Sequence, residues 1–247
     1  MKDRKMAILN IVSNTNKINV SNLAEQLGVS QVTIRKDLVQ LEKDGMLKRF
    51  HGGAMPVSDD DVSNRLSVKF EIKTAIAKKA ASLVDNGETV LIESGSTNAI
   101  LAAELAKLSD VTVITNSAFI CRYVRGFSNL STILLGGDYQ KESEVLVGPL
   151  VRMCLEQFHV KRVFIGVDGF SPGKGFTCVN MMRAEVARLM AQQADEVIVL
   201  TDSSKFEQIG VTTEFKPSDV DIVITDSGIS PDNIQLLTNF GIKVITV

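Results

Sequence analysis

The chain has 247 residues, 45% of them hydrophobic, and a formal net charge of −2 at pH 7. This length fits one α/β domain, or a small domain joined to a larger one, and the apolar content supports a substantial core. No run of about 18 uninterrupted apolar residues occurs, and the first ten residues are charged and then amphipathic, so we expect neither a membrane-spanning helix nor a secretory signal.

The charge is distributed unevenly along the chain. Residues 1–57 contain nine Lys or Arg against five Asp or Glu, a net +4, and the remainder carries −6. A basic N-terminal segment on an acidic body indicates that this segment contacts a polyanion.

Cysteine usage bears on the compartment. Cys121, Cys154 and Cys178 are odd in number and widely spaced, with no pair at metal-ligand spacing. We therefore expect reduced thiols, no metal site and a cytoplasmic protein.

Three helices are predicted near the N-terminus. Residues 3–13 have apolar positions at helical spacing, which predicts a short amphipathic helix. Two further helices follow, separated by a tight corner. Ser21 is expected to cap the first and Gly28 to end it with a positive φ, and Ser30 is expected to cap the second.

The second of these helices has one apolar face. Ile34, Leu38 and Leu41 are spaced to form an inward stripe. Because these positions point inward, Val32, Arg35, Lys36 and Val39 should point outward. Gln31 and Thr33 should be exposed in the first turn of the helix. Cationic and amide side chains on one helix face can bind phosphates and base edges, as in the recognition helix of a helix-turn-helix. A protein-interaction module is the alternative.

The sequence GMLKRFHGGAMP then predicts a two-stranded hairpin around Gly52-Gly53. A hairpin in this place is typical of the wing of a winged helix. Lys48, Arg49 and His51 are then candidates for contacts with the DNA backbone or minor groove, or else form a solvated surface.

These residues together carry a family resemblance. Arg4 with Ile8, the run Ser30–Leu38 (SQVTIRKDL) and the sequence GMLKRFHGGA resemble the DNA-binding head of the DeoR family of bacterial transcriptional regulators. The resemblance implies double-stranded operator DNA as the partner, and Asp37 as a residue that orients the helix. With the hairpin included, the candidate DNA-binding residues are Ser30, Gln31, Thr33, Arg35, Lys36, Arg49 and His51.

The rest of the chain predicts an α/β body. Residues 56–64, with three consecutive Asp, read as a linker, and Ile72, Ile76 and Ala80 mark a helix after it. Seven β-branched runs then recur between helical stretches, which indicates a layered domain with a mostly parallel sheet. We predict a winged helix-turn-helix domain at 1–57, a linker at 58–63 and an effector-sensing and oligomerisation domain at 64–247.

Polar residues cluster where these strands end, which is where open parallel sheets bind ligands. The first such loop, Ser94-Gly95-Ser96-Thr97, lies between a strand and a helix. Hydroxyls, a glycine and a helix N-terminus favour a phosphate cradle, although such loops also serve only to cap helices.

The order of the later segments, from ESGST and TNS to LTDSSKF, is that of the DeoR-type effector domain, which is similar to ribose-5-phosphate isomerase. The resemblance implies a sensor of phosphorylated sugars or related metabolites that acts without a cofactor. The candidate effector-binding residues are Glu93, Ser94, Gly95, Ser96, Thr97, Asn116, Gly136, Gly137, Asp168, Gly169, Lys174, Glu185 and Lys205. For Lys205, a structural salt bridge with Asp202 is the alternative, and for Lys174 a plain loop tip.

Two departures from the pattern bear on the chemistry. Glu93 stands where family members commonly have Asp, and Phe170 and Ser171 follow Asp168-Gly169 where the isomerase has a second acid. The acid–base machinery therefore looks incomplete, and Glu185 is the remaining candidate base. We predict a regulator, a repressor of a carbohydrate-metabolism operon that is at least a dimer (a dimer or tetramer), and not an enzyme. The alternative is a sugar-phosphate isomerase with a DNA-binding appendage.

Overall fold

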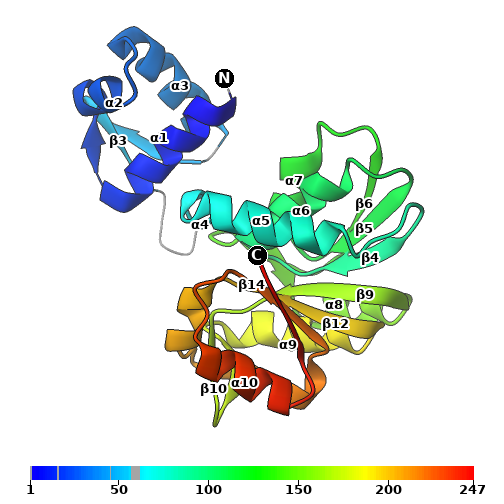
Figure 1. Ribbon diagram of the computed structural model, residues 1–247. Coiled ribbons are helices and arrows are strands. Elements are labelled where there is room, and N and C mark those ends of the chain that lie inside the picture. Colours follow the sequence, from blue (N-terminus) through cyan, green and yellow to red (C-terminus); the bar gives the residue numbers. More distant parts are fainter. Residues whose placement is uncertain (1, 16, 45, 57–61) are drawn as a thin grey trace. The chain divides into compact units, whose positions relative to one another are not determined.

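The structure is a computed structural model that describes residues 2–15, 17–44, 46–56 and 62–247. Its contacts divide the chain into two compact units, Met1–Phe70 and Glu71–Val247, called unit 1 and unit 2 below (Figure 1).

Unit 1 is a winged helix-turn-helix. Its helices are α1 (Lys2–Thr15), α2 (Val20–Gln26), α3 (Gln31–Lys43) and α4 (Val62–Ser67). The strands β1 (Ile18–Asn19), β2 (Lys48–Phe50) and β3 (Gly53–Met55) form an antiparallel sheet in the order β1-β3-β2. The predicted hairpin is therefore present, with a third strand from the segment before α2.

Local signals explain where α3 begins and which face it buries. Ser30 Oγ accepts a hydrogen bond from the backbone N–H of Thr33 at 3.2 Å, as an N-cap does. Gly28 has φ +63°, which glycine adopts without strain. The stripe predicted to point inward is buried, at Ile34, Leu38 and Leu41.

The predicted cap of the first helix is wrong. Helix α2 begins at Val20 with Asn19 as its N-cap residue, and Ser21 is an exposed residue inside the helix. The reason is the strand before it: Asn19 pairs with Gly53, and the Val20 N–H donates to Gly52 O at 2.9 Å. The chain thus enters the helix directly from β1, two residues earlier than the side-chain pattern predicts.

Unit 2 contains a seven-stranded sheet in which every pair of neighbours is parallel. The strand order is β15-β14-β12-β9-β4-β5-β6. All seven predicted β-branched runs form its strands: β4 (Thr89–Ile92), β5 (Val111–Thr115), β6 (Leu130–Leu134), β9 (Val160–Gly166), β12 (Ala194–Leu200), β14 (Ile222–Thr225) and β15 (Lys243–Thr246).

Helices cover both faces of this sheet, as its continuous apolar strands require. Figure 1 shows α6 (Ser96–Leu105) and α7 (Ala118–Val124) on one face, and α9 (Met181–Ala191) and α10 (Pro231–Asn239) on the other. The remaining helices of unit 2 are α5 (Phe70–Ala81) and α8 (Pro149–Leu155). In α5 the predicted apolar positions Ile76 and Ala80 are fully buried.

Two smaller antiparallel sheets lie beside the large one. One pairs β7 (Asp138–Gln140) with β8 (Val145–Val147). The other, ordered β10-β11-β13, contains β10 (Gly169–Ser171), β11 (Gly175–Cys178) and β13 (Thr212–Phe215). Two 3-10 helices, η1 (Ser203–Glu207) and η2 (Pro217–Asp219), complete the unit.

The division between the units differs from the predicted boundary. Residues 58–61 of the predicted linker lie outside the described residues. The last two linker positions, Val62 and Ser63, begin α4, and α4 packs against α1. The contacts therefore place residues 64–70, which we assigned to the second domain, with unit 1. The exact boundary stays a prediction.

No helix in the described parts of the chain is long and apolar enough to cross a bilayer. Cys121, Cys154 and Cys178 are free thiols, and Cys178 is buried.

Candidate functional site

Helix α3 presents one row of side chains to solvent. Val32 is 60% exposed and Val39 48% exposed, and Gln31, Arg35 and Lys36 are exposed beside them. This row combines two cations, an amide and two apolar groups, which is the mixture that reads a major groove. We call it the α3 outer row, defined by these five residues.

At the start of α3, two candidate residues serve the cap. Ser30 Oγ and Thr33 Oγ1 lie 2.9 Å apart, and Thr33 is half-buried. Their hydroxyls hold the first turn of the helix, and Ser30 stays exposed at the end where the helix N–H groups lie.

A partly buried ion pair holds the inner side of α3. Arg4 Nε donates to Asp37 Oδ2 at 2.6 Å, and Asp37 is only 7% exposed. This contact joins α1 to the inner side of α3. It agrees with the orienting role expected for Asp37.

The hairpin is tied to the same helix through Arg49. Its backbone N–H donates to Glu42 Oε1 at 2.9 Å and its Nε to Glu42 Oε2 at 2.6 Å. These hydrogen bonds lower the pKa of Glu42, so its carboxyl stays ionised. Lys48 and His51 are exposed. Arg49 thus connects the β2–β3 hairpin to α3, and its side chain is also exposed to solvent.

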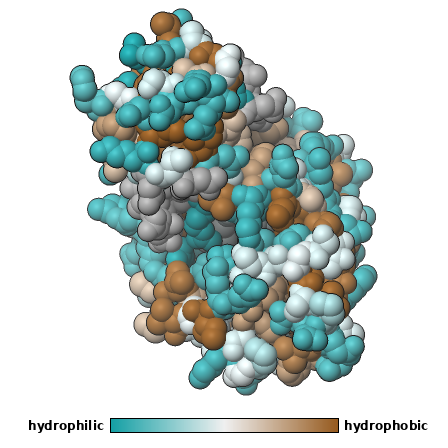
Figure 2. Space-filling view, turned by 60° about the vertical axis from the view of Figure 1, so that its left-hand side comes forward, coloured by the Kyte–Doolittle hydropathy of each residue, from teal (hydrophilic) through white to brown (hydrophobic). Residues whose placement is uncertain are grey.

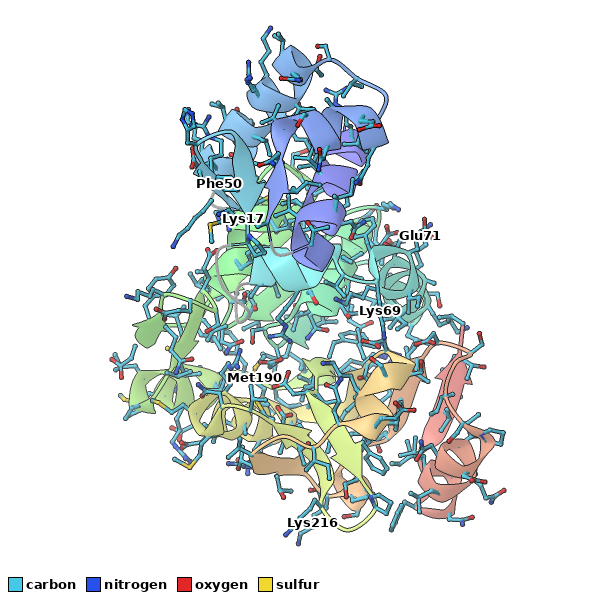
Figure 3. The ribbon with its side chains drawn as sticks, turned by 90° about the vertical axis from the view of Figure 1, so that its left-hand side faces the viewer. Lys17, Phe50, Lys69, Glu71, Met190 and Lys216 are labelled. Atoms are coloured by element: carbon cyan, nitrogen blue, oxygen red, sulfur yellow. The ribbon has the colours of Figure 1, made fainter. Side chains whose placement is uncertain are left out.

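The turn end of the hairpin is closely packed. Lys17 Nζ lies 4.5 Å from the centre of the Phe50 ring (Figure 3). A Cβ on Gly53 would lie 2.3 Å from Ile18 O and 2.3 Å from the same ring. Only glycine fits there, so Gly53 fixes the position of the wing.

In unit 2 the sheet order creates one point where the connections diverge. Within the sheet, β5 and β6 lie on one flank of β4. The strands β9 and β12, which come later in the chain, lie on the opposite flank of β4. Ligands of open parallel sheets bind at the carboxyl ends of the strands at such a switch point. Loop 94–97 comes just after β4, and Val167-Asp168 follows β9.

Buried amides hold the strand ends together. The Ser94 N–H donates to Asn116 Oδ1 at 3.2 Å, which links the ends of β4 and β5. Asn98 Nδ2 donates to Glu93 O at 2.8 Å and to Phe164 O at 3.3 Å, which links β4 to β9. The predicted pair Ser94 and Asn116 is therefore brought together, and Asn98 is a residue that the sequence reasoning missed.

Loop 94–97 leads into the N-terminus of α6. Gly95 has φ +142°, and the first helical hydrogen bond runs from the Ala99 N–H to Gly95 O at 2.9 Å. The N–H groups of residues 96–98 precede this bond and are the helix's free donors. Ser96 and Thr97 are 5% and 8% exposed, so their hydroxyls stand next to these donors in a shielded place. Such donors favour a bound anion.

Glu93 is buried beside the loop. It is 4% exposed, its Oε1 accepts from Ser94 Oγ at 2.5 Å, and its Oε2 lies 3.4 Å from the Gly166 N–H. Burial raises the pKa of Glu93 to about 7, and the hydrogen bond from Ser94 opposes that rise. Near neutral pH this carboxyl therefore changes its protonation state beside the proposed anion site.

Asp168 and Gly169 lie at the end of β9 and the start of the β10–β11 hairpin. Asp168 Oδ2 accepts from the Val179 N–H at 3.0 Å. A Cβ on Gly169 would lie 2.2 Å from Gln208 O. Gly169 is therefore a packing requirement, and Asp168 is the polar group of this pair.

Gly136 and Gly137 follow β6. Gly136 is exposed, and a Cβ on Gly137 would lie 2.7 Å from both Val147 O and Val151 Cγ2. The structure explains Gly137 by the close approach of β8 and α8.

For three predicted charges, the described residues show contacts or positions other than loop 94–97. Glu185 is on the outer face of α9, where its Oε1 accepts from Arg152 at 3.1 Å. Lys174 is exposed in the turn of the β10–β11 hairpin, away from the strand ends where Asp168 lies. Lys205, in η1 after β12, donates through Nζ to Gln208 Oε1 at 3.1 Å. The prediction that these residues bind the effector stays untested.

Two buried charges that we did not predict lie near Glu93. Arg183, on the inner face of α9, is 5% exposed, and its charge lowers the pKa of Glu93. Glu214, in β13, is 2% exposed, and burial together with Glu93 and Asp168 raises its pKa well above the usual value. Alternation in the strand TTEF would place Glu214 opposite the apolar Phe215 and so predict exposure, whereas both residues are buried. For Arg183 the helical face could be found only with the packing known.

Comparisons with known proteins agree with this two-unit organisation. A family model described as "DeoR-like helix-turn-helix domain" matches residues 4–59, and one described as "DeoR C terminal sensor domain" matches residues 69–227.

Curated relatives are similar over almost the whole chain. The HTH-type transcriptional regulator GolR of Listeria innocua is 33% identical, with 98% of this chain and 97% of the relative covered. The HTH-type transcriptional repressor GlcR of Bacillus subtilis is 33% identical, with coverage of 99% and 95%. The putative aga operon transcriptional repressor of Escherichia coli O157:H7 is 30% identical, with coverage of 99% and 93%.

Solved structures are more distant. Ribose 5-phosphate isomerase A of Methanocaldococcus jannaschii matches 56% of this chain and 55% of its own chain, with 20% identity and a TM-score of 0.42.

Proposed function

Because the chain belongs to the DeoR family of transcriptional regulators, we propose that it is a repressor controlled by a phosphorylated sugar or a related metabolite. It binds a two-fold operator as a homo-oligomer in the cytoplasm and controls carbohydrate-metabolism genes. The relatives named as repressors support the direction of control.

The α3 outer row carries the DNA part of the proposal. Arg35 and Lys36 lie beside Val32 on a helix whose other face is buried, and nothing in unit 1 covers them among the described residues. Two cations on this row neutralise phosphates or reach guanine, and the valines contact thymine methyl groups. Ser30, Gln31, Thr33, Arg49 and His51 are the other proposed DNA contacts.

Loop 94–97 carries the effector part. Its unused helix N–H donors and the hydroxyls of Ser96 and Thr97 suit a phosphoryl group. Asn116 and Asp168, at the neighbouring strand ends, suit the hydroxyls of a sugar. We keep Lys205, Glu93, Gly95 and Gly136 as proposed neighbours of the ligand, with Gly137 and Gly169 shaping the backbone around it.

One observation argues against an enzymatic function. Glu185, the candidate base of the isomerase alternative, is 55% exposed and paired with Arg152, and so it is not held in a shielded site. The relatives are transcriptional regulators, which favours the same conclusion.

The proposal is tested in two steps. First, DNA fragments of the genome that encodes the protein are selected by binding to the purified full chain, and the selected operator is used in fluorescence anisotropy. Then a panel of pentose and hexose phosphates, each with its unphosphorylated sugar, is titrated into the complex. We expect at least one phosphorylated sugar, and not its parent sugar, to change operator affinity. A protein that selects no DNA sequence, or responds to none of the phosphates, contradicts the corresponding part.

A further inference from the structure

An acidic side chain continues the row of α3 residues that we propose contacts DNA. Glu42 follows Arg35 by seven positions and Val39 by three. Seven residues are about two turns of an α-helix, so Glu42 lies on the same side of α3 as Arg35, one step beyond Val39. Its side chain is 38% exposed. Most of the surface of unit 1 that Figure 2 shows is hydrophilic, so exposure by itself does not single out this carboxylate.

A carboxylate in this place opposes DNA binding unless a cation balances it. The duplex carries one negative charge for about every 1.7 Å of its axis, and a negative side chain near the phosphates is repelled. The balancing cation comes from the β2–β3 hairpin. Arg49 Nε lies 2.6 Å from Glu42 Oε2, so the charge at the end of the α3 outer row is paired before any DNA arrives.

The geometry of this pair fixes a backbone group and a side chain together. Strand β2 lies at the edge of its sheet, where one side of a strand has no strand partner. The Arg49 N–H of this edge strand donates to Glu42 Oε1 at 2.9 Å, while Nε donates to the other carboxylate oxygen. One carboxylate therefore sets both the position of the strand and the direction of the guanidinium.

The same contact leaves the far end of the guanidinium for a ligand. Nε carries only one of the five N–H donors of an arginine side chain. Among the described residues, the Arg49 side chain has no hydrogen-bond partner other than Glu42, and it is 40% exposed. Its two terminal nitrogens therefore face solvent in the fork geometry that binds phosphate oxygens.

We propose that Glu42 is a positioning residue of the DNA interface. Through its two hydrogen bonds it holds Arg49 at the end of the α3 outer row, where the terminal nitrogens of the guanidinium bind a DNA phosphate. This inference rests on the proposed function, in which Arg49 contacts DNA, and adds the residue that directs it. Helix α3 and the β2–β3 hairpin then meet the duplex as one preformed surface.

The expected consequence is selectivity between DNA sequences. A free arginine side chain binds the phosphates of any duplex, whereas a specific complex needs that side chain in one place. Holding Arg49 before binding removes an ordering cost from the specific complex, which corresponds to about 3- to 10-fold in affinity. The Glu42 charge also repels phosphates that approach in a position where Arg49 does not bind them.

The test compares the full chain and its variants on two duplexes, the selected operator and a scrambled duplex of the same length and composition. The specificity ratio is the affinity for the first divided by the affinity for the second. Glu42→Gln keeps the size of the side chain but offers one acceptor oxygen and no charge, so it cannot hold both Arg49 groups. We expect this variant to lower the specificity ratio about 3- to 10-fold.

A double variant shows whether Glu42 acts through Arg49. Arg49→Ala should weaken operator binding and reduce the steepness of log affinity against log salt concentration by about 0.9, the value for one phosphate contact. In the Arg49→Ala chain, adding Glu42→Gln should leave the specificity ratio unchanged. A change of the ratio in the double variant would show that Glu42 acts by another route, which overturns the inference.

Arg49→Lys reaches the same state without altering Glu42. Lysine keeps the positive charge but has no Nε and no fork. We expect the specificity ratio to fall as it does in Glu42→Gln, with the dependence on salt kept. A wild-type ratio in this variant overturns the inference.

The control removes the same charge elsewhere in unit 1. Glu25→Gln changes an exposed acid of α2 and should keep the wild-type ratio, and circular dichroism checks the folding of each variant. An unchanged ratio in Glu42→Gln, including an equal loss of affinity for both duplexes, or an equal fall in Glu25→Gln, overturns the inference and leaves the proposed function in place. A wild type that selects no operator, or an Arg49→Ala chain with wild-type affinity and salt dependence, contradicts the proposed function as well.

Discussion

Arg4 and Asp37 lie 33 positions apart in the chain, yet the Arg4 guanidinium donates to the Asp37 carboxylate at 2.6 Å. The pair joins α1 to the recognition helix α3 behind the surface that we propose contacts DNA. Since Asp37 is 7% exposed, the Arg4 guanidinium compensates a carboxylate that has little contact with water.

Removing the cation should therefore destabilise unit 1. We expect Arg4→Ala to lower its thermal unfolding midpoint, because a buried carboxylate is left without its partner. Adding Asp37→Asn in the same chain should recover part of the loss, since the amide carries no charge. Calorimetry measures both, with Lys5→Ala on the same helix as the control. Equal midpoints for Arg4→Ala and Lys5→Ala would contradict the structural role.

The exposure of Arg35 in the α3 outer row predicts that this residue contributes to DNA binding. Arg35→Ala should weaken binding of the selected operator by about 10- to 100-fold, the loss that accompanies one base or phosphate contact. Fluorescence anisotropy at fixed salt measures it, and Lys43→Ala, at the exposed end of the same helix, is the matched control. Binding of the sugar phosphate should not change. Equal loss of both activities would mean that the variant damages the whole chain.

At loop 94–97 the prediction concerns backbone conformation. Gly95 has φ +142°, and a Cβ there would have free space, with its nearest neighbour, Asn98 Nδ2, 3.8 Å away. Gly95→Ala should therefore act through strain of about 1–3 kcal/mol and misplace the N–H donors of α6, rather than through a clash. We expect the operator complex to lose its response to phosphorylated sugars and to keep its DNA affinity.

The control for that change is Gly126→Ala, because Gly126 has no positive φ and no close neighbour within 4 Å. If Gly95→Ala responded to the effector as the control does, loop 94–97 would not be the phosphate site.

The raised pKa of Glu93 predicts that the stability of the folded chain depends on pH. This pKa is raised from 4.5 to about 7 by burial, so the folded chain holds this proton over a range where the unfolded chain has released it. The contribution to stability is fully present below pH 4.5 and is lost as pH rises through 7. Glu93→Gln removes this term while keeping a side chain that accepts from Ser94.

We therefore expect Glu93→Gln to gain stability over the wild type between pH 5 and pH 8, by up to about 3 kcal/mol, since one pKa unit corresponds to about 1.4 kcal/mol. Denaturant unfolding at both pH values measures the difference between the two proteins. A difference that does not change with pH would show that Glu93 does not carry the proton. Glu214, which is also buried, is expected to behave the same way and is the natural comparison.

The family matches confirm the sequence prediction of a DNA-binding regulator with a winged helix-turn-helix and a sensor domain. That prediction rested on local signals, because caps, turns and apolar periodicity act over a few residues. Ser30, Gly28 and the stripe Ile34, Leu38 and Leu41 illustrate this. The seven apolar runs likewise identified the strands of the parallel sheet without showing their order.

The tertiary structure alone decided which distant residues meet. That β9 lies beside β4, so that Asn98 bonds to Phe164 O, follows from long-range pairing that no local pattern encodes. Glu185 and Arg183 are two positions apart on α9, which turns them to opposite faces of the helix. The packing of α9 against the sheet determines which face of this helix is buried. It buries Arg183 near Glu93 and leaves Glu185 exposed to solvent.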